Sequence, residues 1–277
     1  MSTISTIAIQ GIKGSFHHSV VEKFFDGTQS LVECLSFDVL VESVLDKTSD
    51  VAVMAIENSI AGSIIPNYAL IDTHDLNIIG EYYLDIQHNL IAFPGQKIED
   101  IKEVHSHPMA LLQCKAFFKL YPKIKLVEAK DTADVAKSIS ENNIKGIAAI
   151  ASKTASSLYG LDILAQSIQT IKHNETRFVI VKSEKANIND TDINKASLKF
   201  ELDHKRGSLA AILNVLSDCK LNLTKIQSLP KIDMPWKYAF FIDVTFDEYT
   251  DYKKAKSIVN IMAENFKILG EYKNAKS

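Results

Sequence analysis

The sequence DVAVMAIENSIAGSIIPNYALID, residues 50–72, contains the pattern that decides the fold class. Residues 50–56, which are apolar from Val51 onward, predict a buried strand, and residues 63–72 have the spacing of a helix that tolerates Pro66 in its first turn. Polar residues stand between the two at Glu57-Asn58-Ser59. The same alternation of strand and helix continues on both sides of this stretch, which predicts an α/β fold built on parallel sheets.

Two sets of alternating elements make up the first part of the chain. In the first set, strand patterns at 6–9 and 50–56 alternate with a turn at 11–14 and helical patterns at 15–25, 37–45 and 63–72. In the second set, from about Leu76, strand-like segments around 78–92, 103–104, 124–127 and 146–150 alternate with helical patterns beginning near Pro108, Thr132 and Ser152. A last strand is expected at 176–181. These sets predict a body of two lobes.

The C-terminal part has a different order of elements. Residues 185–194 are polar without a usable period, which is typical of a linker. Beyond them, strands are expected at 197–202, 221–228, 238–246 and 266–272, and helices at 207–216 and 252–265. This βαββαβ order is ferredoxin-like, and a unit this small often completes its sheet by pairing with a copy.

Composition excludes several classes of protein. The chain has 277 residues, with 31 Lys+Arg against 34 Asp+Glu and a net charge of −3, so no strong field for nucleic acid or an acidic membrane is expected. Cys34, Cys114 and Cys219 are far apart and odd in number, which favours reduced thiols and a cytoplasmic location. The N-terminus lacks a secretion signal pattern, and no run of about 18 apolar residues predicts a membrane span.

The first two of four polar clusters follow predicted strands. Residues 11–16, GIKGSF, combine two glycines with a helix start, whose free N–H groups suit an anion. A plain strand-to-helix turn explains them equally well, because glycine is common wherever a chain turns tightly. In residues 57–62, ENSIAG, Asn58 or Ser59 is either a helix cap or a ligand contact.

The other two clusters contain the residues most suited to chemistry. In residues 106–114, SHPMALLQC, Ser106 is a candidate N-cap, and His107 is interpreted as a helix-start histidine because no nucleophile accompanies it. Residues 174–178, NETRF, contain Arg177, one of only two arginines in the chain. A guanidinium grips a carboxylate with a fork of two hydrogen bonds, so a small carboxylate ligand is favoured. Pairing of Arg177 with a structural carboxylate such as Glu57 is the alternative.

Cofactor motifs are missing from the sequence. It has no Walker A loop, no GxGxxG and no paired histidines at metal-binding spacing, so no cofactor and no metal are expected. The residues alone therefore predict a two-lobed α/β body that binds a small anion, joined to a regulatory-looking module. They do not identify a reaction.

Taken together and in order, the clusters resemble the motifs of the prephenate dehydratase family, in its monofunctional bacterial form with a C-terminal ACT domain. The matching stretches are Gly11–Phe16, Glu57–Ser59 with Gly62, Ser106–Pro108 with Gln113-Cys114, Asp131–Ala133, Ala148–Leu161 and Asn174–Phe178. Met109 departs from the pattern, since the family usually has Gln there. Six motifs in the same order span most of the chain, although each is weak alone.

The resemblance implies a two-lobed, periplasmic-binding-protein-like (type II) catalytic domain at 1–184. Its first lobe is expected at about 1–76 plus 177–184 and its second at about 77–176. A linker at 185–196 and a ferredoxin-like βαββαβ ACT domain at 197–277 follow. At this length, a fusion to a mutase or dehydrogenase domain is not expected.

The resemblance also implies a lyase that converts prephenate to phenylpyruvate, with loss of CO2 and water, in L-phenylalanine biosynthesis. Thr176 then hydrogen-bonds the departing hydroxyl and Arg177 holds a carboxylate. Because a threonine hydroxyl is a poor acid, the ultimate proton donor is expected to be a carboxyl, with Glu57 as the first candidate, or water. The substrate-binding residues implied are Asn58, Ser59, Ser15, Ser106, Gln113, Thr132 and Phe178.

The ACT resemblance implies feedback inhibition by L-phenylalanine at an interface between subunits of a homodimer or homotetramer. The segment Gly207-Ser208-Leu209-Ala210 is similar to the family's GALV, whereas Gln227-Ser228-Leu229-Pro230 keeps only Ser and Pro of its ESRP. The expected phenylalanine-binding residues are Gly207, Ser208, Leu209, Ala210, Gln227 and Ser228.

Two alternatives remain open. An arogenate dehydratase differs only in the amine or keto group of the substrate side chain, and no residue distinguishes it. A non-catalytic amino-acid sensor would keep the binding body beside an ACT module. The intact Thr176-Arg177-Phe178 argues against the sensor.

Overall fold

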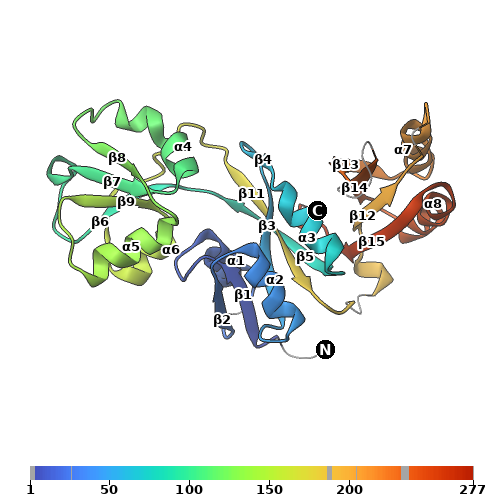
Figure 1. The fold of residues 1–277 in the computed structure, drawn as a ribbon, viewed down its shortest axis with the longest axis horizontal. Helices are drawn as coiled ribbons and strands as arrows, with labels where there is room; N and C mark the ends of the chain where they lie inside the picture. Colours follow the sequence, from blue (N-terminus) through green and yellow to red (C-terminus); the bar gives the residue numbers. More distant parts are fainter. Residues whose placement is uncertain (1–3, 26, 186–188, 204, 232–236, 277) are drawn as a thin grey trace. The chain divides into compact units, whose positions relative to one another are not determined.

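The computed structural model describes residues 4–25, 27–185, 189–203, 205–231 and 237–276. The chain divides into two compact units, the first comprising Met1–Ser63 with Tyr83–Phe178 and the second Ile64–Tyr82 with Val179–Ser277 (Figure 1). Part of the expected linker, residues 186–188, lies outside the described residues.

A mixed sheet carries the N-terminal strands of the first unit. Its elements are β1 (Thr6–Gln10), α1 (Phe16–Phe24), β2 (Ser30–Cys34), α2 (Phe37–Leu45), β3 (Val51–Asn58), β4 (Gly62–Ser63) and β11 (Glu175–Lys182). β1 is parallel to both β2 and β3, and the strand order is β11-β3-β1-β2. Residues 51–56 are all buried, as the apolar run predicted for a central strand covered on both faces.

The second sheet of the first unit lies between helices on both faces. Its elements are β6 (Asn89–Ala92), η1 (Ile98–Asp100), β7 (Glu103–Ser106), α4 (Pro108–Phe118), β8 (Lys125–Glu128), α5 (Thr132–Glu141), β9 (Ile147–Ala151), α6 (Lys153–Tyr159) and β10 (Asp162–Ala165), with strand order β10-β6-β9-β7-β8. Leu90 and Ile150 pack with α4, whereas Ile91 and Ala149 pack with α5 and α6. Successive strand residues therefore feed two separate cores.

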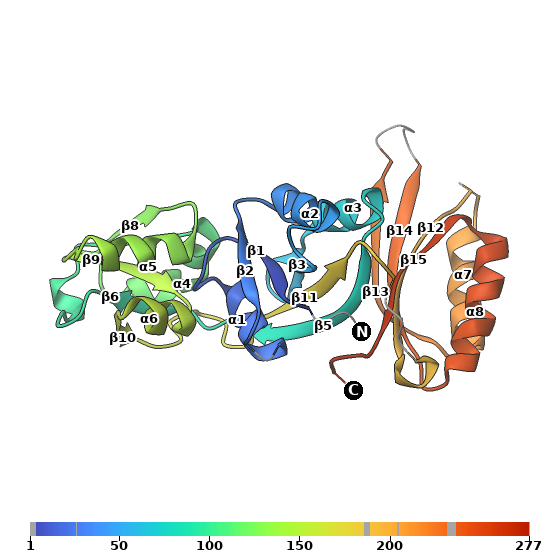
Figure 2. The same cartoon turned by 90° about the horizontal axis from the view of Figure 1, so that it is seen from below.

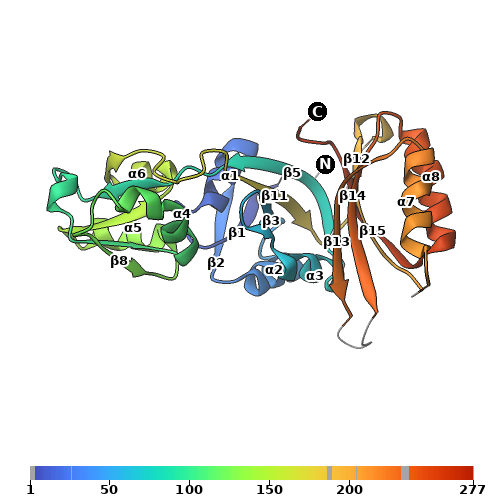
Figure 3. The ribbon, with the colours of Figure 1, turned by 90° about the horizontal axis from the view of Figure 1, so that it is seen from above.

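The second unit contains the predicted βαββαβ module. Its elements are α3 (Ile65–Thr73), β5 (Asn77–Asp85), η2 (Asp190–Asp192), β12 (Lys195–Glu201), α7 (Ser208–Asp218), β13 (Asn222–Pro230), β14 (Tyr238–Thr245), α8 (Tyr249–Met262) and β15 (Glu264–Tyr272). The strand order is β13-β14-β12-β15-β5. Figures 2 and 3 show α7 and α8 side by side on one face of the four module strands. Phe200, Ile212, Tyr252 and Val259 belong to the core between these layers.

One predicted strand is wrong. The segment around 78–92 is two strands, β5 and β6, separated by residues 86–88. The backbone there bonds elsewhere: the Ile86 N–H donates to the Asn174 carbonyl at 2.6 Å, and the His88 N–H donates to Gln169 Oε1 at 3.0 Å. These partners are distant in sequence, so periodicity did not reveal the break.

Helix α3 and strand β5 are attached to the module by close packing and a buried ion pair. β15 meets β5 at the single pair Gly270–Ile78, where a Cβ on Gly270 would lie 2.3 Å from the Ile78 carbonyl oxygen. Only glycine allows this approach. Lys195 Nζ lies 2.9 Å from both carboxylate oxygens of Glu81, with side chains 3% and 0% exposed. Loss of either partner leaves a buried charge uncompensated.

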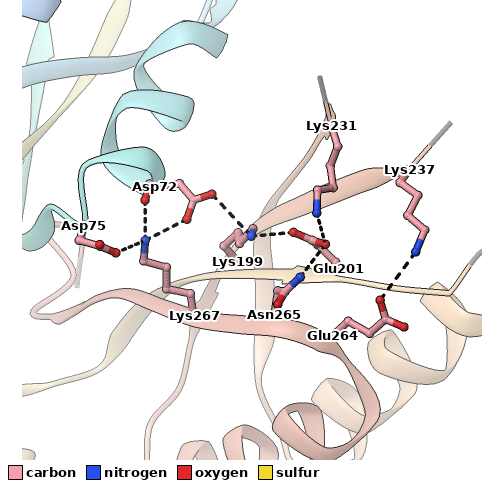
Figure 4. A network of polar contacts seen from close by, with 9 residues as sticks. All are labelled: Asp72, Asp75, Lys199, Glu201, Lys231, Lys237, Glu264, Asn265 and Lys267. Atoms are coloured by element: carbon pink, nitrogen blue, oxygen red, sulfur yellow. Dashed lines mark hydrogen bonds and ion pairs between the residues drawn. The ribbon is translucent and has the colours of Figure 1, made fainter. Parts of the chain in front are cut away.

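A network of charged side chains joins the end of α3 to the module (Figure 4). Lys267 on β15 donates to Asp72 Oδ1 at 3.0 Å and also pairs with Asp75. Lys199 on β12 lies 3.6 Å from Asp72 and 2.9 Å from Glu201. Asp72 therefore bridges two strands of the module.

Glu201 is the buried acid at the centre of this network. It is 5% exposed, and it accepts hydrogen bonds from Lys231 at 2.7 Å and Asn265 at 2.9 Å. Burial raises the pKa of the Glu201 carboxyl, but the hydrogen bonds from Lys231, Asn265 and Lys199 offset this and lower the pKa to about 2. The carboxylate is thus stabilised in its charged form.

We expect Glu201→Gln to reduce the free energy of unfolding by about 1–3 kcal/mol near neutral pH, because charge-assisted hydrogen bonds are lost. Since the folded-state pKa lies below the ordinary 4.5, the stabilisation exists above pH 4.5 and is lost as the pH falls toward about 2. Urea unfolding of both proteins across this range should show their difference shrinking. The matched control is Glu264→Gln, where the carboxylate is 51% exposed and 4.0 Å from Lys237. Equal loss in both variants would contradict the assignment.

Candidate active site

Five polar side chains of the first unit form a continuous chain of hydrogen bonds. Asn58 Nδ2, at the end of β3, donates to Thr176 Oγ1 at 2.8 Å and to Asn174 Oδ1 at 2.7 Å. Asn174 Nδ2 donates to Gln113 Oε1 on α4 at 2.9 Å. His88 Nε2, just before β6, lies 2.8 Å from the same Gln113 oxygen. The chain therefore joins residues from three of the four polar clusters. It also includes His88, which belongs to none of the clusters.

The loop after β3 fixes the direction of Asn58. Its Oδ1 accepts from the backbone N–H groups of Ile60 at 3.0 Å and Ala61 at 2.8 Å, so its NH2 group must face Thr176 and Asn174. The next residue ties the loop to β11: the Ser59 N–H donates to the Glu175 carbonyl at 2.8 Å, and Ser59 Oγ accepts from the Glu175 N–H at 2.9 Å. The interpretation of these residues as a helix cap is wrong, because Ile64 is the N-cap of α3.

Thr176 is held as a hydrogen-bond donor. It is 8% exposed, and its oxygen accepts from Asn58. Within the described ranges its hydroxyl proton has no acceptor, so the proton is available to a bound molecule. Accepting a hydrogen bond polarises the O–H group and makes it a better donor.

Strand alternation separates the residues of the fourth cluster. Successive side chains of a strand point to opposite faces, so Thr176 and Phe178 share one face of β11 and Arg177 lies on the other. Phe178 packs edge-on against His17, with ring centroids 5.0 Å apart. Along β3, Glu57 likewise points opposite to Asn58. Arg177 is 4% exposed, and Glu57 is partly buried.

The structure places three other predicted site residues at the ends of strands and helices. Ser15 is the N-cap of α1, and Thr132 is the first residue of α5, after its N-cap Asp131. Ser106 is fully buried, and its hydroxyl donates to the Ile150 carbonyl at 2.8 Å. Across the portion of the chain that is described, none of Ser15, Thr132 and Ser106 bonds to the five-residue chain.

The histidine at the start of α4 has the structural role expected from the sequence. His107, not Ser106, is the N-cap, and its Nδ1 accepts from the Met109 N–H at 3.2 Å. The interpretation of His107 as a helix-start residue is therefore confirmed, and that of Ser106 as the cap is wrong.

The glycine turn after β1 is packed against α6. The Gly14 carbonyl accepts from Ser152 Oγ at 2.6 Å, and the Lys13 carbonyl accepts from the Tyr159 hydroxyl at 2.6 Å. Gly14 has φ +91°, and a Cβ there would lie 3.1 Å from the Tyr159 ring and 3.2 Å from Ala155. Both backbone conformation and close packing therefore require glycine at this position.

Sequence reasoning missed His88, which is 4% exposed. Burial lowers the pKa of its imidazole, against a smaller opposite effect of the bond with Gln113. Burial also lowers the pKa of nearby His17 to about 3 and raises that of the Cys114 thiol, beside Gln113, to about 12. Each of these groups is therefore neutral near neutral pH. No local motif marks His88, because its partner is 25 residues away.

A cavity of about 560 Å3 adjoins the site between α1, the end of β5 and α6. Phe16, Gln87 and Ser152 are among its lining residues. The Phe16 ring also packs edge-on against His88, with centroids 5.6 Å apart. The hydrogen-bonded chain itself lies outside this cavity lining.

The second unit has its own small cavity at the start of α7. Gly207, with φ +84°, is the N-cap of α7, and Ala210 lies on that helix. Ser208 and Leu209 line a cavity of about 180 Å3 together with Leu202, Asp203, Lys205, Lys237, Tyr238 and Phe240. Gln227 and Ser228 lie on β13, outside this lining, and Gln227 Nε2 donates to the Ser228 carbonyl at 2.9 Å.

Among the residues with described positions, no group of three or more His, Cys, Asp or Glu side chains is arranged to hold a metal ion. None of the helices in the described ranges is long and apolar enough to span a bilayer. The three cysteines are free thiols, as predicted.

Comparison with known proteins identifies the family to which the chain is similar. A family model of prephenate dehydratase matches residues 7–186. The chain is 38% identical over 248 residues to "Arogenate dehydratase/prephenate dehydratase 2, chloroplastic" of Arabidopsis thaliana, covering 86% of this chain and 64% of that protein. The chain therefore spans less than two thirds of the length of that curated relative.

Solved structures share the fold. The prephenate dehydratase of Arthrobacter aurescens in complex with L-Phe has a TM-score of 0.88 at 26% identity, over 98% of this chain and 90% of that one. GqqA, described as a novel type of quorum quenching acylase, has the same TM-score and identity over 98% of both chains. Since one fold occurs in proteins described with different activities, the residues of the site must decide the reaction.

Proposed function

Because the chain belongs to the prephenate dehydratase family, we propose that it converts prephenate to phenylpyruvate in L-phenylalanine biosynthesis. The observation that carries this proposal is Thr176, whose oxygen accepts from Asn58 and whose proton faces no acceptor in the described part of the chain. This arrangement suits a group that donates to a departing hydroxyl.

The proposed reaction needs no electron sink. Prephenate is a dianion; its ring carboxylate leaves as CO2, and the C–C bonding electrons enter the ring. The C–O bond breaks at the same time, and one proton converts the departing hydroxide to water. Phenylpyruvate keeps the other carboxylate. Because aromatisation drives the step, the protein must position the substrate, exclude water and direct the proton.

Thr176 orients the leaving hydroxyl in this proposal, and a stronger acid supplies the proton. Glu57 is the first candidate and water the second. Arg177 is proposed to hold a carboxylate. Because Glu57 and Arg177 point to the faces opposite Asn58 and Thr176, their pairing with each other or with structural groups is the competing assignment.

The remaining contacts to the substrate are proposed to be neutral and polar. Asn58 and Gln113 have the strongest support, since both belong to the hydrogen-bonded chain that ends at Thr176. The other proposed contacts are Ser59, Ser15, Ser106, Thr132 and Phe178. Neutral groups orient an anion without stabilising its ground state so strongly that the reaction is slowed.

The proposed domain organisation follows the family. A two-lobed, periplasmic-binding-protein-like catalytic domain is proposed at 1–184 and a ferredoxin-like ACT domain at 197–277; the linker expected at 185–196 ends before Lys195, where β12 begins. The βαββαβ order and the strand order β13-β14-β12-β15 support the last assignment. Free cysteines support a cytoplasmic location.

L-Phenylalanine is proposed to inhibit the enzyme by binding at the ACT module, as the L-Phe complex of the Arthrobacter relative suggests. Gly207, Ser208, Leu209 and Ala210 are the proposed contacts on one subunit. Gln227 and Ser228 on β13 are the proposed contacts from a second copy. β13 is a sheet edge with alternating exposed residues, which supports pairing of copies as a dimer or tetramer.

An arogenate dehydratase remains the second candidate, and the naming of the Arabidopsis relative for both activities favours testing it. The non-catalytic sensor remains the third. Assays of purified protein with prephenate and with arogenate, each with and without L-phenylalanine, separate the three. Turnover of neither substrate would leave the sensor.

We expect Thr176→Ala to lower kcat on prephenate about 100- to 1000-fold with a much smaller change in KM, because the donor acts on charge that develops as the C–O bond breaks. Thr176→Ser keeps the hydroxyl and is the matched control, with kcat within about tenfold of wild type. Steady-state phenylpyruvate formation measures both. A near-normal kcat for the alanine variant would remove Thr176 from the mechanism.

Glu57→Gln tests the proton donor. If Glu57 supplies the proton, kcat should fall roughly 100-fold or more. Arg177→Lys tests carboxylate binding, and KM should rise at least tenfold, because lysine cannot form the bidentate fork.

Thermal unfolding of the Glu57 and Arg177 variants is the control for both predictions. A Tm loss without a kinetic change would assign both residues to structure.

Lys267→Met tests how inhibition is transmitted. It removes the contacts between β15 and Asp72 and Asp75, so we expect L-phenylalanine to bind with a similar Kd while inhibition requires at least fivefold more of it. Lys253→Met is the control, because it removes only an exposed pair with Asp190. Gly270→Ala should act like Lys267→Met through steric displacement from Ile78. Unchanged inhibition in both the Lys267 and the Gly270 variants would show that inhibition is not transmitted through the contacts of β15.

A further inference from the structure

His88 lies in the short segment between β5 and β6, and its side chain reaches the hydrogen-bonded chain from the end opposite to Thr176. The backbone on both sides is fixed: the His88 N–H donates to Gln169 Oε1 at 3.0 Å, and its carbonyl accepts from the Ile168 N–H at 2.8 Å. The imidazole is therefore held rigidly beside Gln113.

The state of the imidazole follows from its partner. Gln113 Oε1 accepts from Asn174 Nδ2 and lies 2.8 Å from His88 Nε2. A carbonyl oxygen only accepts, so Nε2 carries the proton. His88 Nδ1 is buried without a hydrogen-bond partner among the described residues. A buried acceptor left unpaired is costly, which indicates that the side chain is kept for the bond that Nε2 makes.

The direction of every amide in the chain is set from its two ends. Backbone N–H groups of Ile60 and Ala61 fix Asn58 at one end, and His88 fixes Gln113 at the other. Asn174 can then only accept from Asn58 and donate to Gln113. A flip of the Gln113 amide would set two donors against each other at Asn174 and again at His88, so the His88 bond adds a second penalty to the flipped orientation.

The consequence for a ligand lies in the NH2 group of Gln113. With Oε1 occupied by two donors, Nε2 of Gln113 points away from them, and it has no acceptor among the residues described. Gln113 is only partly buried. Its N–H groups are thus free to donate to an oxygen of a bound molecule.

We propose that His88 is a positioning residue that fixes Gln113 with its N–H groups toward a substrate carboxylate or keto oxygen and keeps the amide chain aligned to Thr176. This rests on the proposed function, since the substrate is taken to be prephenate. His88 itself does not touch the reacting atoms, and it acts through Gln113.

The kinetic test compares His88→Leu with His88→Gln. Leucine fills the site but removes the donor, so kcat/KM on prephenate should fall roughly ten- to a hundredfold. Glutamine places an amide N–H near the position of Nε2 and should restore activity to within about fivefold of wild type. Equal loss of activity in both variants would overturn the proposal. It would show that the N–H group makes no difference and that His88 serves only to fill space.

A double-mutant cycle separates positioning from general destabilisation. If His88 acts through Gln113, His88→Leu should change kcat/KM less than about twofold in a Gln113→Ala background. Multiplication of the two single effects would overturn the proposal. Thermal unfolding of all variants shows whether each is folded under the assay conditions.

A second readout does not depend on turnover. 15N NMR of histidine-labelled protein near neutral pH should show His88 as the neutral Nε2–H tautomer, with the resonances changed in Gln113→Ala. A charged imidazole or the Nδ1–H tautomer would overturn the positioning role. If wild type turns over neither prephenate nor arogenate while the tautomer is as expected, the proposed function fails and the positioning of Gln113 stands.

Discussion

The bonds of the Asn58 amide hold the site together. Its oxygen is occupied by two backbone N–H groups of its own loop, and its nitrogen reaches Thr176 and Asn174 at the start of β11. One side chain thus sets the end of β3, the start of β11 and the direction of the threonine hydroxyl. Replacing it leaves buried donors and acceptors unpaired in several places at once.

A site built from amides, a hydroxyl and a neutral imidazole suits a reaction that needs direction more than acid strength. In the proposed reaction, charged groups near the leaving hydroxyl would have to be desolvated, whereas amides carry fixed dipoles at smaller cost. Burial keeps the imidazoles of His17 and His88 neutral, so the polarity of the site does not change near neutral pH. In the proposed reaction, Thr176 is too weak an acid to protonate the leaving hydroxyl itself. The only acidic group that the site then needs is the donor of one proton.

The sequence predicted the features that depend on local pattern. Apolar runs such as 51–56 gave the buried strands, and the order of helices and strands from Lys195 to Tyr272 agrees with the structure. It failed where contacts between distant residues decide the outcome. The break at 86–88 exists because the backbone N–H groups of Ile86 and His88 bond to Asn174 and Gln169. The proposed role of His88 depends on Gln113, which is 25 residues away in the sequence. Alternation along β11 follows from the sequence and predicts that Thr176 and Arg177 lie on opposite faces of the strand, while their assignment to one site stays a prediction.

Chain connectivity links the module to both ends of the amide chain. Helix α3 begins at Ile65, six residues after Ser59. Its Asp72 forms ion pairs with Lys199 and Lys267 of the module. Strand β5, which meets the module at Gly270 and through Glu81, ends at Asp85, three residues before His88. The two anchors that fix the amide directions are thus covalent continuations of the two elements packed against the module.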